Sequence, residues 1–96
     1  MRTNFQMIME FRDYQSAERG IVSFEEIKII KEHFCMFDMS PLELQNLRDM
    51  VVLMYGNWTR DARSKGDWYE FDSKSDTMSA ITAVIDTVKV AKLCEI

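Results

Sequence analysis

Residues 39–44 read Met-Ser-Pro-Leu-Glu-Leu, and this stretch carries the signals of a helix that begins at Pro41. The Ser40 hydroxyl can accept the backbone N–H of Glu43, whose side chain can return to the Ser40 backbone. Proline is favoured at the first helical position because an N–H there would have no partner. The methionine before this cap and the second leucine after it have the spacing of a hydrophobic staple. A helix N-terminus is therefore predicted here.

The same capping-box spacing occurs at two earlier sites, Thr3 with Gln6 and Ser23 with Glu26. Apolar residues at helical spacing follow each site, so the sequence predicts an all-α fold. Short connections between successive helices favour a small antiparallel bundle. We expect about four helices, roughly at residues 4–19, 24–37, 41–64 and 76–93, with an aromatic loop at 66–75.

Two of these helices carry further expectations. Phe5, Met7, Met9 and Phe11 recur at every second position as in a strand, but the Thr3 cap and a stop at Gly20 favour a helix. Apolar residues lie on two sides of this first helix, so it is either sandwiched in the core or shared with a partner. The inner stripe of the second helix is expected to consist of Phe24, Ile27, Ile30, Phe34 and Phe37.

Length and composition limit the classes of protein. Ninety-six residues, 47% hydrophobic and 29% charged, predict one globular domain spanning residues 1–96. The net charge of −4 disfavours generic nucleic-acid binding, which relies on basic side chains. No secretion signal or membrane-length apolar run is present, so we expect a cytoplasmic protein without membrane contact.

Catalytic and metal-binding patterns are absent from the sequence. His33 and Cys35 stand two residues apart, on opposite sides of a helix, and cannot form a dyad. The chain lacks a glycine-rich phosphate loop, and two cysteines with one histidine do not complete a zinc site. We therefore expect no enzymatic activity, no catalytic residue, no cofactor and no metal, and two free, partly buried thiols at Cys35 and Cys94.

Aromatic and cationic residues concentrate in one segment, residues 58–74. Tryptophan, tyrosine and arginine dominate the hot spots of protein interfaces. Aromatic faces with cationic support also hold nucleotides. In a third interpretation the aromatic side chains close the end of the bundle and the arginines pair with nearby aspartates. The residues are Trp58, Arg60, Arg63, Lys65, Trp68, Tyr69, Phe71 and Lys74.

Several apolar residues do not fit a single inner face of their helices. Apolar surface that a small bundle cannot bury indicates self-association or a partner. The alternative is that the first helix packs centrally and contacts different helices on its two sides. The residues are Met7, Phe11, Tyr14, Ile29, Met36, Leu42 and Leu53, with Val90, Leu93 and Ile96 at the C-terminal end.

These patterns predict a small acidic interaction module that docks on a larger protein as an inhibitor or adaptor, with a homodimer as a second way to cover the apolar surface. Immunity proteins, antitoxins and phage-encoded inhibitors are similar in size and class only. The expected interface is Trp58, Arg60, Arg63, Trp68, Tyr69, Phe71, Met7, Phe11 and Tyr14. The alternative is an oligomer that binds a nucleotide or other anionic ligand through Arg60, Arg63, Lys65 and Lys74, with Trp68 and Tyr69.

Overall fold

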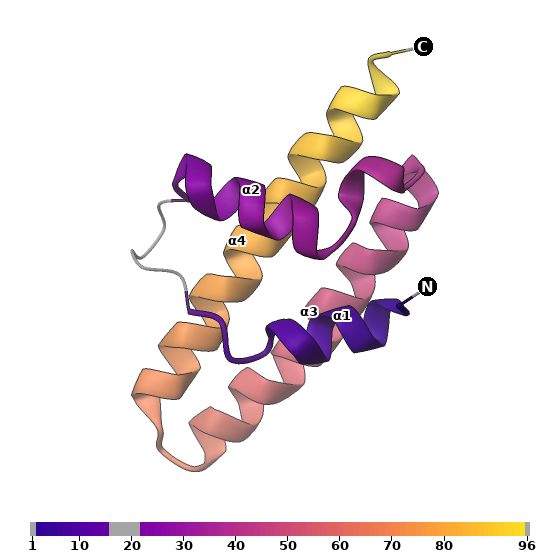
Figure 1. Ribbon diagram of the computed structural model, residues 1–96. Helices are drawn as coiled ribbons and strands as arrows, with labels where there is room; N and C mark the ends of the chain where they lie inside the picture. Colours follow the sequence, from indigo (N-terminus) through magenta and orange to yellow (C-terminus); the bar gives the residue numbers. More distant parts are fainter. Residues whose placement is uncertain (1, 16–21, 96) are drawn as a thin grey trace.

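The computed structural model describes residues 2–15 and 22–95 and confirms a small all-α bundle. Two long helices form an antiparallel hairpin, and two short helices cross it on one side, α1 against α3 and α2 against α4 (Figure 1). The elements are α1 (Asn4–Phe11), α2 (Phe24–His33), the 3₁₀ turn η1 (Met36–Asp38), α3 (Pro41–Ser64) and α4 (Trp68–Leu93). None of the described helices is long and apolar enough to cross a membrane.

The predicted caps start the first three α-helices. Thr3 and Ser40 form complete capping boxes, and Pro41 occupies the first turn of α3. Ser23 accepts from the Glu26 N–H at 3.2 Å, but its own hydroxyl donates to the Glu26 carboxylate, so the return bond to the backbone is not made. The segment after Thr3, which also alternated like a strand, is helical, and its capping box is complete.

The first helix is shorter than predicted and ends at Phe11. Beyond it, backbone carbonyls accept side-chain donors from the hairpin: the Phe11 carbonyl accepts the Tyr55 hydroxyl at 3.1 Å, and the Arg12 carbonyl accepts the Lys74 ammonium. Carbonyls bound in this way no longer need a following helical turn. The helix expected to reach residue 19 is therefore wrong for residues 12–15, and the proposed Gly20 stop lies outside the described residues.

The connection between α3 and α4 occupies residues 65–67 only. Gly66 has a φ of 74°, its N–H bonds the Arg63 carbonyl, and the Asp67 N–H bonds the Ala62 carbonyl, which together form a Schellman motif. The Asp67 side chain then accepts from the Glu70 N–H at 3.0 Å and starts α4. The aromatic loop expected at 66–75 is therefore wrong, because Asp67 caps α4 and the helix begins at Trp68 rather than at residue 76.

The second helix also ends early, at His33 rather than at residue 37. Cys35 adopts a left-handed conformation, with a φ of 53°, and redirects the chain into η1. Lys92 of α4 donates to the carbonyls of Met36 at 3.0 Å, Phe37 at 2.9 Å and Met39. These bonds fix η1 against the C-terminal part of α4.

All four helices contribute to one hydrophobic core. α3 supplies Tyr55, which is fully buried, and α4 supplies Ile81 and Ile85. At the edge of the hairpin, Arg48 pairs with Asp86 at 2.8 Å. The buried apolar residues of the core are Met7, Ile8, Phe11, Ile30, Phe34, Met36, Leu44, Leu47, Val51, Tyr55, Ala80, Ile81, Val84, Ile85 and Val88.

Candidate interaction surface

The predicted aromatic residues lie near the α3–α4 turn but differ in exposure. Trp58 is partly buried, packs edge-on against Tyr55 at 4.8 Å between ring centroids, and carries the Arg12 guanidinium 5.0 Å above its ring. Trp68 and Tyr69 are 59% and 72% exposed, and Phe71 is partly buried against Trp68. Trp68 and Tyr69 therefore provide the open apolar surface here, which we call the turn surface.

The cations of the same segment do not gather into one site. Arg60 and Arg63 are exposed on α3, and Lys65 pairs with Asp61 at 3.0 Å. A cavity near the α3–α4 turn has a volume of about 210 Å³, and neither Arg60 nor Arg63 lines it. Its lining combines two cations with three carboxylates: Arg12, Lys65, Asp61, Asp67 and Glu70, together with Trp58 and Ala62.

Lys74 was predicted to bind a ligand, and the structure corrects this prediction. The residue is only 2% exposed and donates to the Arg12 carbonyl. Carboxylate oxygens of Glu70 and Asp13 lie 3.6 Å and 3.9 Å from its ammonium nitrogen. Its charge is thus used to hold the segment after α1 against α4.

Met7 and Phe11 were predicted to lie in the interface, but both belong to the core. They are 3% and 5% exposed, because α1 lies against α3 and the Phe11 ring packs against His33 and Phe34. Tyr14 is partly buried and stacks on Phe11 with the ring centroids 4.5 Å apart. Burial, followed by the charge of Glu26 and a hydrogen bond to its carboxylate, raises the pKa of the Tyr14 hydroxyl.

The remaining described apolar residues that were expected to lie off the inner helix faces are exposed, except for Met36. Met36 is buried because η1 turns it toward the core. Ile29, Leu42, Leu53, Val90 and Leu93 are exposed as expected, and Ile96 lies outside the described residues. Both thiols, predicted to be partly buried, are exposed and free.

The most exposed aromatic side chain of the described residues, Phe24, was not among the residues predicted to form the interface. Phe24 and Phe37 were assigned to the inner stripe of the second helix, but they are 92% and 66% exposed. The stripe holds for Ile30 and Phe34, which are buried. Phe37 leaves it because the helix ends at His33, and a helix boundary placed there is the signal that would have separated Phe37 from the stripe.

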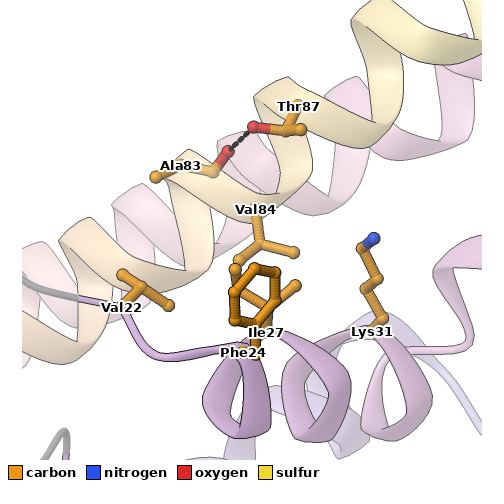
Figure 2. Close-up of a pocket in the computed structure, with 7 residues that line it drawn as sticks. All are labelled: Val22, Phe24, Ile27, Lys31, Ala83, Val84 and Thr87. Atoms are coloured by element: carbon orange, nitrogen blue, oxygen red, sulfur yellow. Dashed lines mark hydrogen bonds between the residues drawn. The ribbon is translucent and has the colours of Figure 1, made fainter.

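Phe24 lies at the mouth of a groove between α2 and α4, which we call the α2 groove. Its volume is about 260 Å³ (Figure 2). Val84 points from α4 toward Ile27 and Phe24, while Lys31 stands at one side. The Thr87 hydroxyl donates to the Ala83 carbonyl of its own helix at 2.9 Å, so it does not need a partner in the groove.

A second cavity of about 310 Å³ continues this surface along α2. Phe24, Ile27 and Lys31 line both cavities. The Lys31 ammonium lies 5.6 Å from the centroid of the Phe37 ring. The aromatic side chains Phe24 and Phe37 thus flank a lysine on one continuous surface.

The His33 side chain has a structural role. The His33 Nε2–H donates to the Met7 carbonyl at 2.7 Å, and its ring packs against Phe11 and Phe34. Within the described residues, three or more histidine, cysteine or acidic side chains nowhere come together as a metal site. Protein-family models, curated proteins and solved structures yielded no match to this chain.

Proposed function

We propose that this protein acts by binding another protein through exposed apolar surface, as an inhibitor or adaptor. A single observation carries the proposal. Twelve large apolar side chains of the described residues are exposed and take no part in the buried core. They are Phe5, Met9, Phe24, Ile29, Phe37, Leu42, Val52, Leu53, Trp68, Tyr69, Val90 and Leu93.

Physical chemistry favours a partner for such a surface. Each square ångström of apolar surface removed from water contributes roughly 25 cal/mol, so covering several of these side chains can drive association. Scattered apolar residues are ordinary on a protein surface, but continuous patches mark binding sites. Here Phe24 and Phe37, which line one cavity on α2, and Trp68 and Tyr69 of the turn surface are two pairs of exposed aromatic side chains.

The anionic-ligand alternative gains no support from the geometry. Lys74 is committed to the fold, and the cavity near the turn carries Asp61, Asp67 and Glu70, which repel an anion. We therefore propose protein binding rather than binding of an anionic ligand.

The experiment is quantitative co-purification with four forms of the full chain. These are wild type, Phe24→Ser with Phe37→Ser, Trp68→Ser with Tyr69→Ser, and the polar control Asn57→Ala. We expect wild type and control to recover the same protein near one-to-one, and at least one aromatic double variant to lose it. All substituted side chains are exposed, so thermal unfolding should be nearly unchanged.

Light scattering on the purified chain completes the test. A homodimer that either aromatic double variant dissociates identifies the partner as a second copy. A wild-type chain that stays monomeric and recovers no protein near one-to-one would contradict the proposal. Retention of the partner by both aromatic double variants would contradict it as well.

A further inference from the structure

We propose that the α2 groove receives an acidic amphipathic helix of a partner protein, with one apolar side chain of that helix seated between α2 and α4. The inference rests on the proposed function and specifies its site and the chemistry of the partner. Shape, lining and charge of the described residues each support it.

The shape suits the side chain of a docked helix. Pockets for small ligands usually enclose about 300–1,000 Å³, and the α2 groove, at about 260 Å³, is slightly smaller. It shares Phe24, Ile27 and Lys31 with the neighbouring cavity on α2. A helix laid along such a surface can insert one apolar anchor and place the next one, three or four residues away, in the adjoining cavity.

The lining selects an apolar anchor. The groove walls come from Val22, Phe24 and Ile27 on one side and from Ala83 and Val84 on the other. The Thr87 hydroxyl is bonded within α4, so it places no unsatisfied polar group in the groove. A polar anchor would lose its bonds to water without replacement, which makes it unfavourable.

Charge selects an acidic flank. Across the two cavities the charged lining residues are Lys28, Lys31 and Glu32, a positive excess on a chain whose net charge is −4. Within residues 2–15 and 22–95, no carboxylate lies within ion-pair distance of either lysine. Carboxylates of a bound helix can therefore pair with both ammonium groups at the rim of the contact.

The test is selection from a phage-displayed library of random 16-residue peptides against the full chain. We expect the selected peptides to combine leucine or aromatic residues at helical spacing with a net negative charge. The affinity of a synthesised selected peptide should fall roughly tenfold or more with Phe24→Ser, as truncation of an anchoring aromatic residue does. Leu53→Ser, which removes an exposed side chain from α3, is the matched control and should leave the affinity unchanged.

A separate pair of variants tests the attraction between the two lysines and an acidic peptide. Lys28→Gln with Lys31→Gln should weaken the acidic peptide several-fold, and the loss should shrink as salt is raised, because salt screens the attraction. Lys65→Gln, at an exposed lysine beside the α3–α4 turn, should have no effect.

Each opposite outcome would overturn the inference. Selected peptides that are neutral or basic remove the charge argument, and peptides that keep their affinity for Phe24→Ser bind elsewhere. A library that yields no binder, or a self-association of the chain that Phe24→Ser abolishes, excludes the proposed occupant. If the co-purified partner is lost with Trp68→Ser and Tyr69→Ser but kept with Phe24→Ser and Phe37→Ser, this inference fails while the proposed function stands.

Discussion

Lys74 shows how one side chain can connect two distant segments. Its ammonium donates to the Arg12 carbonyl from a site with almost no solvent access. Lys74→Met keeps the apolar stem but removes a charged hydrogen bond, so we expect the free energy of unfolding to fall by about 2 kcal/mol. Urea unfolding measures the loss. The control Lys65→Met removes a surface ion pair and should cost under about 0.5 kcal/mol; equal losses for the two variants would contradict this view of Lys74.

Tyr55 makes stability depend on alkaline pH. Burial, with a smaller contribution from the charge of Asp13, raises its pKa above the usual 10.0. Above pH 10 the unfolded chain therefore loses a proton that the folded chain keeps. The free energy of unfolding is fully retained below pH 10 and then falls by about 1.4 kcal/mol per pH unit as pH rises toward the folded-state pKa.

Tyr55→Phe tests this dependence. At neutral pH the variant should be less stable by about 1–2 kcal/mol, because the Phe11 carbonyl loses its donor. From pH 10 to 11 its urea midpoint should fall less steeply than that of wild type. Tyr69→Phe is the control for removal of an exposed tyrosine. Parallel pH profiles for Tyr55→Phe and wild type would refute the assignment.

At the scale of elements, the two glycines of the α3–α4 hairpin have opposite roles. Gly56 lies inside α3, and an added Cβ there would meet no atom within 4 Å. Gly56→Ala should raise stability by about 0.5–1 kcal/mol, as alanine does in a helix interior. Gly66 has a φ of 74°, so Gly66→Ala should lower stability by about 1 kcal/mol. Thermal unfolding of both variants gives the two signs, and equal signs would contradict the helix assignments.

Sequence predicted the elements where the signal is local and failed where it is tertiary. Caps at Thr3, Ser23 and Ser40 involve residues three positions apart, and they begin the helices as expected. The end of α1 depends on donors from Tyr55 and Lys74, which are more than 40 positions away. No periodicity within the first helix could reveal them.

For the candidate site too, local features could be predicted from the sequence and tertiary ones could not. Of the apolar residues expected to lie off the inner helix faces, Met7, Phe11 and Met36 are buried, whereas others are exposed. The exposed ones are Ile29, Leu42, Leu53, Val90 and Leu93, and Trp68 and Tyr69 are exposed as well. Phe37 was misplaced because helical spacing cannot show that the chain turns at Cys35. Phe24 is the first residue of α2, and spacing within the helix cannot show that no other element covers it there. Chemistry-bearing residue types can be found from sequence, whereas their exposure depends on which elements cover them.

At the scale of the whole molecule, the hairpin and the N-terminal segment should differ in local stability. α3 and α4 have 24 and 26 residues and pack along each other, whereas α1 has eight. Native-state hydrogen exchange should therefore show α1 opening at a lower free energy than the interior of the hairpin. Lys74→Met should speed exchange in α1, because the Lys74 ammonium holds the segment after α1 through the Arg12 carbonyl. Uniform exchange across all helices would contradict this expectation.

The anchoring of the N-terminal segment has a consequence for biosynthesis. Backbone carbonyls of Met7, Phe11 and Tyr14 accept donors from His33, Tyr55 and Thr77, one from each later α-helix. A ribosome delivers these donors in order, with Thr77 after His33 and Tyr55. The contacts of the α1 segment are therefore completed only after α4 has been made, and a nascent chain stalled before α4 would leave the Tyr14 carbonyl without its Thr77 donor.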